Sequence, residues 1–284
     1  MNTGSQKQKG IMLIIVSAFF FALMGLFVQL AGDIPFYQKA VFRNAVAMVV
    51  STAVILQGRI GIGVEKECRF PLALRILFGI AAVYCNYYGI DHLPLASASS
   101  LNKTGPFFAV LFAIVFFGDS LSRNQLLSIL TAFAGSLFLI LPNLGTVGFA
   151  SIIALMSGAA TGVVHNALRM MRKRGNIHNS VIVFWFCSIS TTVAVLSCIG
   201  HWHPMSIRQV LIMICAGLSS TLGQYAMTAA FRYAPPKEIS VFDFTQIVFS
   251  AIMGLAFFGQ IPTVYSLIAY VLLILASVIQ LRAC

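Results

Sequence analysis

The stretch Leu93–Asp119, LPLASASSLNKTGPFFAVLFAIVFFGD, decides the predicted fold of this chain. It is long enough to cross a bilayer, is apolar toward its C-terminal end, and closes with Gly118-Asp119. Its middle nevertheless carries Asn102-Lys103-Thr104-Gly105-Pro106. A buried lysine and a proline inside a helix are both costly, so we expect other residues of the fold to compensate them. Pro106 predicts a kink in this span that frees a backbone carbonyl near residue 102.

The composition excludes a soluble protein. The chain has 284 residues, of which 59% are hydrophobic and 9% are charged, whereas soluble domains carry about 25% charged residues. The net charge of +11 does not indicate nucleic-acid binding, because no basic and aromatic residues alternate in a polar context. The six cysteines show no CxxC spacing, so we predict no disulfide framework and no metal site. We also predict no cofactor.

Apolar runs of about 20 residues predict spanning helices. We place ten of them, at 10–31, 36–56, 70–91, 94–117, 124–141, 148–170, 179–200, 207–231, 237–258 and 262–281. The connections between them are short and rich in Gly and Pro, which leaves no room for a separate domain. The sequence therefore predicts an all-α integral membrane protein with ten transmembrane helices.

The lysines and arginines predict the orientation in the membrane. With the N-terminus in the cytoplasm, 14 of the 18 basic residues lie on the cytoplasmic side, Arg75 and Arg169 among them, and two lie on the other side. The remaining two, Arg43 and Lys103, fall inside spans. We predict a multi-pass protein of the plasma (inner) membrane with both termini in the cytoplasm.

An internal repeat relates the two halves of the chain. FFGD at Phe116–Asp119 recurs as FFGQ at Phe257–Gln260, 141 residues later. The same offset relates Pro94 to Pro235, Asn102 to Asp243 and Thr104 to Thr245. Five spans in each half are an odd number, so the second half enters the membrane from the opposite side. We predict two inverted five-helix repeats, 1–141 and 142–284, a construction typical of secondary transporters with a binding site near the midplane.

The pattern resembles the drug/metabolite transporter superfamily, in the form with two EamA domains. The resemblance covers nearly the whole chain, and the residues that carry it are Phe42-Arg43-Asn44-Ala45, Tyr87-Tyr88-Gly89-Ile90 with Leu93-Pro94-Leu95-Ala96, GQYAMTAAFRYAPPKEISVF at 223–242, and the FFGD and FFGQ stops. The family usually has Glu where this chain has Gln260. The resemblance implies two EamA-like repeats that pack as inverted five-helix bundles around a central cavity.

Polar residues inside spans are the first candidates for a substrate site, because a charge at the bilayer centre costs at least ~2.5–3.5 kcal/mol. Asn102 and Asp243 lie eight residues past Pro94 and Pro235, which is about 12 Å from opposite membrane surfaces. A pair between Lys103 and Asp243 would either latch the two halves together or be opened by a substrate or a proton. A third alternative is that the two side chains never meet.

Neighbouring spans carry further candidates. Gln224, His165 and Gln246 lie in polar stripes at helical spacing, which face either a cavity or polar partners on other helices. His165 is either a proton acceptor or a satisfied buried histidine. Tyr84 and Trp185 lie at depths where their rings wall a cavity, or else belong to an interfacial aromatic belt. The predicted substrate-binding residues are Asn102, Lys103, Asp243, Gln246, Gln224, His165, Tyr84, Trp185 and Arg43.

We predict a secondary active transporter, not an enzyme, that moves a small polar organic metabolite such as an amino acid, an amine or a nucleoside-like molecule by alternating access. The chain has no GxxxxGK[ST] motif, so ATP is not its direct energy source. Protons are a candidate co-substrate. Two alternatives stay open: a lipid-headgroup flippase or non-catalytic membrane partner, and an integral membrane enzyme based on His201 and His203. The expected partners are the substrate and the lipid bilayer, with the protein as a monomer or homodimer.

Overall fold

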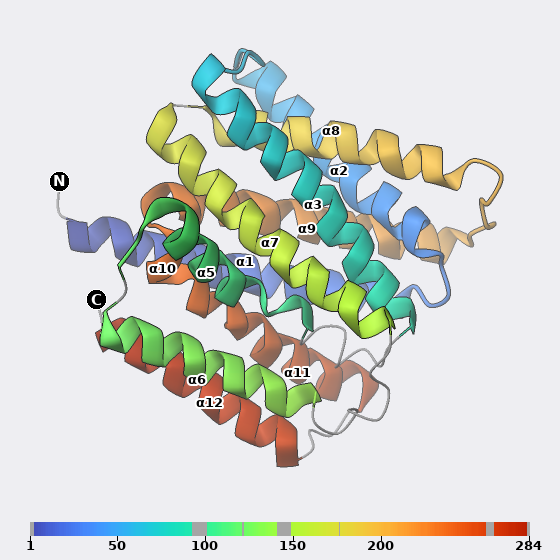
Figure 1. Cartoon of the computed structure of the whole chain (residues 1–284). Helices are drawn as coiled ribbons and strands as arrows, with labels where there is room; N and C mark the ends of the chain where they lie inside the picture. Colours follow the sequence, from blue (N-terminus) through green and yellow to red (C-terminus); the bar gives the residue numbers. More distant parts are fainter. Residues whose placement is uncertain are drawn as a thin grey trace.

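The computed structural model describes residues 3–92, 101–120, 122–140, 149–175, 177–259 and 264–282, and these residues form a bundle of α-helices (Figure 1). No β-strand occurs in these ranges, which confirms the predicted all-α class. The helices are α1 (Thr3–Leu30), α2 (Phe36–Gln57), α3 (Lys66–His92), α5 (Gly105–Phe117), α6 (Arg123–Ile140), α7 (Phe149–Arg174), α8 (Asn179–Cys198), α9 (Ile207–Tyr233), α10 (Pro236–Ile239), the 3₁₀-helix η2 (Ser240–Phe244), α11 (Thr245–Phe258) and α12 (Val264–Arg282).

The apolar character of the helices fits a membrane protein. Seven segments of the described chain are long and apolar enough to cross a membrane by length and composition: Gln6–Leu30, Phe36–Gln57, Lys66–Gly89, Phe149–Arg174, Asn179–Cys198, Ile207–Tyr233 and Val241–Phe258. Large apolar side chains such as Leu77, Phe116 and Ile207 point outward, at 65%, 72% and 82% exposure, as lipid-facing positions do. The fourth predicted span is described only from residue 101, so the count of ten stays a prediction.

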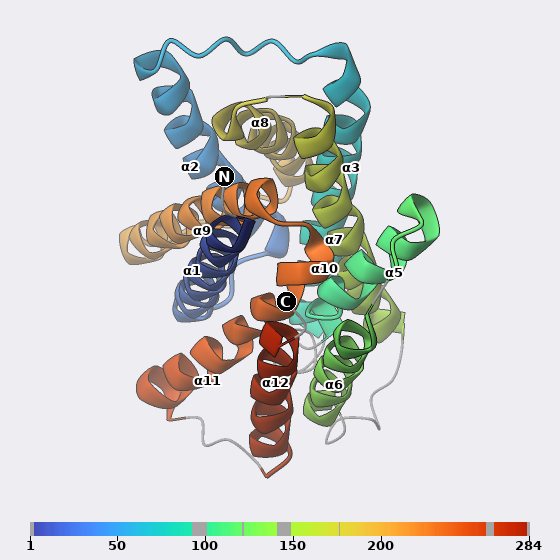
Figure 2. The ribbon, with the colours of Figure 1, turned by 90° about the vertical axis from the view of Figure 1, so that its left-hand side faces the viewer.

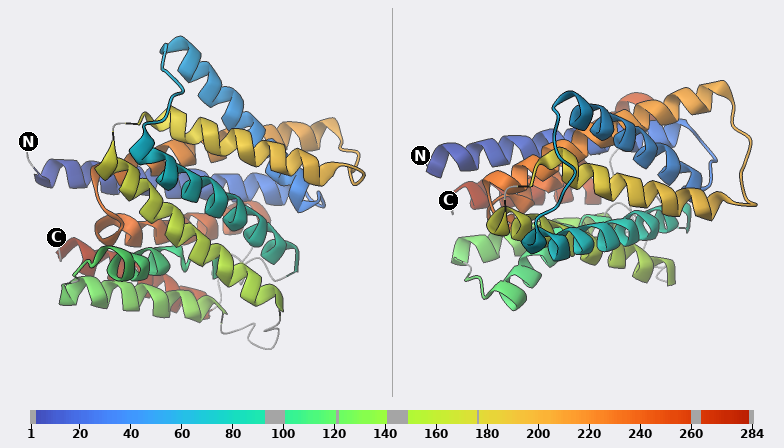
Figure 3. Two further views of the ribbon diagram at one scale, coloured as in Figure 1. Left: turned by 45° about the horizontal axis from the view of Figure 1, so that its top comes forward. Right: turned by 90° about the horizontal axis from the view of Figure 1, so that it is seen from above.

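The helix bounds repeat with the 141-residue offset found in the sequence. The offset maps the limits of α3, residues 66 and 92, onto those of α9, residues 207 and 233, and it relates α5 to α11 and α6 to α12 to within one residue. The predicted boundary between the repeats, at residues 141 and 142, lies outside the described residues. Both termini lie at the same end of the bundle (Figure 3).

The helix contacts also follow the repeat, because each helix packs on the same kind of partner as its repeat mate does. Helix α1 packs on α9, and α7, which the offset relates to α1, packs on α3. Helix α2 packs on α8 and α6 packs on α12, so each contacts its own repeat mate. Figure 2 shows α2 and α8 at one edge of the bundle and α6 and α12 at the opposite edge, with the other pairs between them. The arrangement has the twofold pattern expected of two related five-helix units.

Small residues let helices approach closely where the site forms. A Cβ on Gly158 of α7 would collide with the Thr104 hydroxyl, and one on Gly162 would lie 2.7 Å from the Phe108 Cβ. Close helix contacts in membrane proteins typically use small residues spaced in this way. These glycines therefore hold the beginning of α5 directly against α7.

Candidate functional site

One helix break in each repeat forms the frame of the site. Lys103 and Thr104 form a turn before α5, and η2 precedes α11 in the second repeat. The Thr104 hydroxyl donates to the Leu101 carbonyl at 2.6 Å, and the Thr245 hydroxyl donates to the Phe242 carbonyl at 2.7 Å. The offset of 141 relates the two donors and the two acceptors. The same side-chain hydrogen bond therefore closes both breaks.

The interruption expected at Pro106 is present, but as a helix break before α5 instead of a kink inside a continuous helix. Helix α5 begins at Gly105, with Pro106 in its first turn, where the missing N–H of proline costs little because those N–H groups have no helical partner. The second repeat breaks at the corresponding place although it carries Ile247 instead of a proline. Proline therefore begins the new helix in one repeat but does not cause the break that both repeats share.

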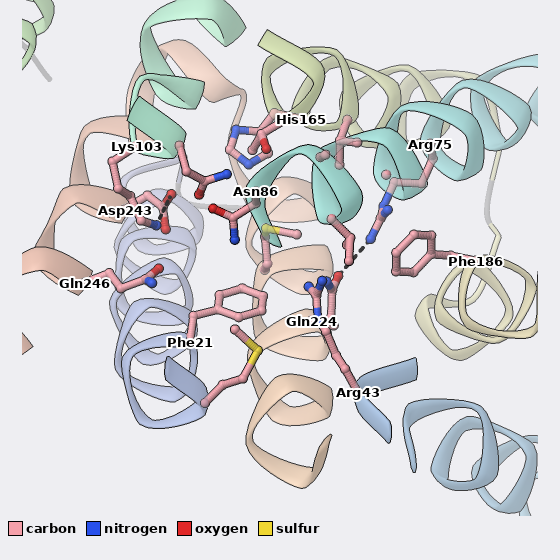
Figure 4. Close-up of a pocket in the computed structure, with 18 of the residues that line it drawn as sticks. Phe21, Arg43, Arg75, Asn86, Lys103, His165, Phe186, Gln224, Asp243 and Gln246 are labelled. Atoms are coloured by element: carbon pink, nitrogen blue, oxygen red, sulfur yellow. Dashed lines mark hydrogen bonds and ion pairs between the residues drawn. The ribbon is translucent and has the colours of Figure 1, made fainter. Parts of the chain in front are cut away.

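A buried ion pair joins the two breaks. Lys103 Nζ lies 3.1 Å from Asp243 Oδ2, and the two side chains are 9% and 8% exposed (Figure 4). The predicted encounter of these residues across the repeats is thus present in the structure. Asn102 donates from Nδ2 to the Ser157 hydroxyl at 2.9 Å, which ties the first break to α7. The ion pair compensates the buried lysine, since an unpaired charge at this depth would be strongly destabilising.

A cavity of about 120 Å³ lies beside this pair, between helices of both repeats. Seven of the nine predicted residues line it, namely Arg43, Asn102, Lys103, His165, Gln224, Asp243 and Gln246. Charged and amide side chains thus converge on one space between helices of both repeats. Figure 4 shows Lys103, Asp243 and Gln246 at one end of this space and Arg75, Gln224 and Arg43 at the other.

Two arginines form the second end of the cavity. Arg75 of α3 is 2% exposed and donates from Nη2 to Gln224 Oε1 at 2.8 Å. Its guanidinium also stacks on Phe186, 4.0 Å from the ring centroid. Arg43 of α2 donates from Nε to the Ser220 hydroxyl at 2.9 Å. Because Ser220 and Gln224 lie one turn apart on α9, they hold both guanidinium groups on one face of that helix.

Gly79 makes the position of Arg75 possible. It lies one turn after Arg75 on α3, and a Cβ there would collide with the Arg75 guanidinium and lie 2.7 Å from the Phe186 ring. Any residue other than glycine would push the guanidinium away from α3. The glycine therefore fixes the arginine in a narrow space between its own helix and Phe186.

His165 of α7 is fully buried at the wall of the cavity. Its ring packs on Phe231 with 4.5 Å between centroids, and neither ring nitrogen has a hydrogen-bond partner among the described residues. The charged residues that line the same cavity are Arg43, Arg75, Lys103 and Asp243. A histidine with both nitrogens unpartnered next to a polar cavity can take or release a proton there.

Tyr84 and Trp185 do not line the cavity. The Tyr84 hydroxyl lies 3.1 Å from the Ser197 hydroxyl, and Trp185 donates from Nε1 to the Ile62 carbonyl at 3.1 Å, near a helix end. Their depth along the helices was the basis of the prediction, but depth does not determine which way a side chain points around the helix. Phe186, one residue after Trp185, lines the cavity instead, as do Phe21 and Tyr87.

Sequence reasoning missed Arg75 because the basic-residue count assigned it to the cytoplasmic surface. Helix α3 begins at Lys66, so Arg75 lies nine residues, about 14 Å, inside the helix. Arg169 had the same assignment but is 5% exposed and forms a bidentate pair with Asp119, at 2.7 and 2.8 Å. Arg75 and Arg169, both counted on the cytoplasmic side, are therefore buried, and the orientation of the termini stays a prediction.

A family model supplies the observation that identifies the family. The model, described as "EamA-like transporter family", matches residues 8–141 and again residues 148–282. The chain belongs to the EamA-like transporter family. The resemblance to the drug/metabolite transporter superfamily in the sequence is thereby confirmed, including the presence of two EamA copies. An EamA-like chain with apolar helices of this kind is a multi-pass membrane transporter.

Named relatives of this EamA-like transporter are also transporters. The pseudopaline exporter CntI of Pseudomonas aeruginosa is 27% identical over 274 residues, which cover 95% of each chain. Solute carrier family 35 member G1 of Mus musculus is 26% identical and covers 89% of this chain and 73% of its own length. A riboflavin transporter of Brucella anthropi is 24% identical over 92% of this chain and 94% of its own. One crystal structure at 15% identity has a TM-score of 0.80 over 96% of each chain, which shows the shared fold.

Proposed function

We propose that this EamA-like transporter is a secondary active carrier that moves a small polar organic metabolite by alternating access, with the cavity as its binding site. One observation carries the proposal: buried charges of both signs, contributed by both repeats, converge on the cavity. A helix bundle that served only as a scaffold would gain stability from apolar residues at these positions. The named cargoes of the pseudopaline exporter and the riboflavin transporter support an organic substrate.

The proposed binding residues form two groups. Lys103, Asp243 and Gln246 stand at the end built from the helix breaks, while Arg43 and Gln224 stand at the other end. Asn102, next to Lys103 in the chain, also lines the cavity. We propose that a substrate spans the two groups and competes with Lys103 or Asp243 for its partner. Such competition would couple binding to the separation of the repeats, because the pair joins one break to the other.

The size of the cavity supports a conformational cycle. Its volume of about 120 Å³ is well below the roughly 300–1,000 Å³ of pockets for drug-sized ligands. An organic metabolite therefore requires an opening of the bundle before it can enter. The turn at Lys103–Thr104 and the 3₁₀-helix η2 interrupt the helical hydrogen bonds, so we propose them as the points about which the helices move.

Proton coupling through His165 is part of the proposal. The residue is buried, has unpartnered ring nitrogens among the described residues, and lines the same cavity as Lys103 and Asp243. Protonation would place a further positive charge in the cavity and would favour the release of Lys103 from Asp243. A His165→Gln variant in liposomes should lose the dependence of flux on a pH gradient while keeping exchange of substrate at equal pH. An unchanged response to the gradient would remove His165 from coupling.

The transport proposal is tested with purified protein in liposomes and labelled amino acids, amines, organic acids and nucleosides. We expect flux of at least one class above that of empty liposomes, and loss of that flux in Asp243→Asn. Arg208→Gln is the matched control, because Arg208 is an exposed residue at the first turn of α9 and should leave flux unchanged. The absence of flux for every class would reject the carrier mechanism.

We also propose that both termini lie in the cytoplasm and that the protein is a monomer or a homodimer. The termini lie at the same end of the bundle, which supports an even number of crossings. Protease access to tags at each end, in sealed right-side-out vesicles, would test the orientation, and cleavage of either tag would contradict it.

A further inference from the structure

We infer that the substrate carries an oxyanion group, a carboxylate or a phosphate, and that this group binds between Arg43 and Arg75. The inference rests on the proposed function, since it concerns the ligand of the same cavity. It starts from a difference between buried Arg75 and half-buried Arg43 on one side and two further buried cations, Lys103 and Arg169, on the other. Lys103 and Arg169 each have a carboxylate partner, Asp243 and Asp119, whereas Arg43 and Arg75 have none among the described side chains.

The acidic residues of the described chain cannot supply the missing charge. Six acidic side chains are described, and three of them, Asp119, Glu238 and Asp243, pair with other cations. The other three, Asp33, Glu65 and Glu67, are exposed. A buried guanidinium without a counter-ion is strongly unfavourable. A ligand that brings a negative charge would remove this cost, whereas an amine or a cation would increase it.

The hydrogen-bonding groups at this end are donors. A guanidinium has five N–H donors and no acceptor, and Arg75 Nε has no partner among the described residues. The only hydrogen bond of Arg43 among them leaves from Nε to Ser220, so its two terminal nitrogens remain available. Gln224 accepts from Arg75 through Oε1, which leaves its amide nitrogen as another donor. An oxyanion, which offers only acceptors, matches this set.

Geometry holds these donors in place before a ligand arrives. Phe186 covers one face of the Arg75 guanidinium, and stacking on a ring leaves the N–H groups at the guanidinium edge free for an oxyanion. Gly79 closes the space on the side of α3. Ser220 and Gln224, one helical turn apart on α9, each accept a hydrogen bond from one of the two arginines and so hold both at the same face of that helix. Preorganised guanidinium groups of this kind bind carboxylate and phosphate oxygens in a bidentate manner.

The total charge of the cavity agrees with this assignment. The charged residues of the lining are Arg43, Arg75 and Lys103 against Asp243, a net charge of +2 with His165 neutral. Since Lys103 and Asp243 neutralise each other, the whole excess resides at the arginine end. The site is therefore polarised, and an anionic group of the substrate has only one favourable end to occupy.

The first experiment measures thermal unfolding of the purified, detergent-solubilised protein in sodium acetate, sodium succinate and inorganic phosphate. Sodium chloride at equal ionic strength is the reference, and acetamide and ethylammonium chloride are the neutral and cationic probes. We expect an oxyanion salt to raise the unfolding temperature, because a ligand that binds the folded state stabilises it. Stabilisation by acetate and succinate assigns a carboxylate, and stabilisation by phosphate alone assigns a phosphate. Stabilisation by none of the three salts, or by ethylammonium instead, would overturn the inference.

Variants then locate the effect. Arg75→Gln should weaken oxyanion binding by about 10- to 100-fold, the usual effect of losing a charged hydrogen-bond donor, and Arg75→Lys should weaken it less. Without ligand, Arg75→Gln should unfold at the same or a higher temperature than the parent protein, because an unpaired buried charge is removed. If Arg75 served only to stabilise the fold, Arg75→Gln would instead unfold at a lower temperature than the parent protein. Arg208→Gln is the control and should retain full oxyanion binding, and equal binding by Arg75→Gln would place the anion elsewhere.

Liposome flux separates this inference from the carrier proposal. If the protein moves only amines or neutral compounds, the carrier proposal stands and the oxyanion site is rejected. If acetate or phosphate binds in an Arg75-dependent manner but no compound of any class crosses the membrane, the oxyanion site stands and the carrier proposal fails. Flux of a carboxylate or phosphate compound that Arg75→Gln reduces would support both.

Discussion

The ion pair between Lys103 and Asp243 either only stabilises the fold or opens during transport, and variants of the pair distinguish these two roles. The two charged atoms lie 3.1 Å apart with side chains 9% and 8% exposed, which at an effective dielectric constant of 20 gives an attraction of about 5 kcal/mol. Removing one partner leaves the other charge buried. We therefore expect Lys103→Met and Asp243→Leu each to lower the free energy of unfolding by about 3–5 kcal/mol.

The double variant Lys103→Met with Asp243→Leu separates the two roles. It leaves no unpaired charge and puts apolar side chains of similar volume in place of the pair, so it should recover most of the stability that each single variant loses. Unfolding of the four proteins in mixed micelles, analysed as a double-mutant cycle, measures the coupling. If the pair opens during transport, the stable double variant should have no flux in liposomes.

A weaker ion pair gives the control. Lys7 and Glu238 are 3.8 Å apart with side chains 18% and 28% exposed, and Lys7→Met should cost less than about 1 kcal/mol. Flux of the Lys103–Asp243 double variant at the rate of the parent protein would show that the pair is only a latch. Losses of under about 1 kcal/mol in both single variants would show instead that water reaches the pair, and the electrostatic argument would be refuted.

Four further substitutions test particular contacts and backbone conformations. Arg169→Gln leaves Asp119 without its bidentate partner and should cost about 3 kcal/mol in unfolding free energy, measured in the same micelles. Gly118→Ala and Gly259→Ala place a Cβ at φ values of 63° and 61° and should each lower stability by about 1–2 kcal/mol, by nearly equal amounts if the repeats are equivalent. Gly158→Ala drives a methyl group into the break before α5 and should cost about 1–3 kcal/mol and reduce liposome flux.

Matched variants check these expectations. Arg172 is exposed on the same helix as Arg169, so Arg172→Gln should change stability by less than about 0.5 kcal/mol. A Cβ on Gly25 of α1 meets no atom within 4 Å, so Gly25→Ala should be neutral or stabilising by up to about 1 kcal/mol. Equal effects of Arg169→Gln and Arg172→Gln would contradict the contact of Arg169 with Asp119, and equal effects of Gly158→Ala and Gly25→Ala would contradict the close contact at Gly158.

The fold was largely predictable because its signals are local or periodic. Apolar runs locate the helices. A fixed offset relates Asn102 to Asp243 and Thr104 to Thr245, so the sequence alone predicts that these two segments approach each other near the membrane centre. The break in the second repeat was not predicted. It has no proline at the corresponding position, and the hydrogen bond from Thr245 to Phe242 uses residues that also occur inside ordinary helices.

The site was predictable only in part, because the direction of a side chain around its helix depends on packing. The depth of Trp185 was consistent with a cavity position, yet its neighbour Phe186 is the residue that reaches the cavity. Arg75 lies near the predicted beginning of a span, where the positive-inside rule favours the surface. Its burial depends on Gly79 beside it and on Gln224 from the other repeat, and the second of these contacts is not visible in the sequence of α3.

The two repeats share their backbone but not their charges, and this has a consequence for the proposed cycle. The bidentate pair of Asp119 and Arg169 joins the end of α5 to α7, but the offset of 141 places Gln260 and Val28 at the related positions. The same ion pair therefore cannot form at the opposite end of the bundle. In an alternating-access cycle the two closed states are related by the repeat, so they would be equal in energy only if their contacts were equal. Because each 1.4 kcal/mol shifts a population tenfold, a pair that forms in one closed state and opens in the other would favour the state that closes the α5–α7 end.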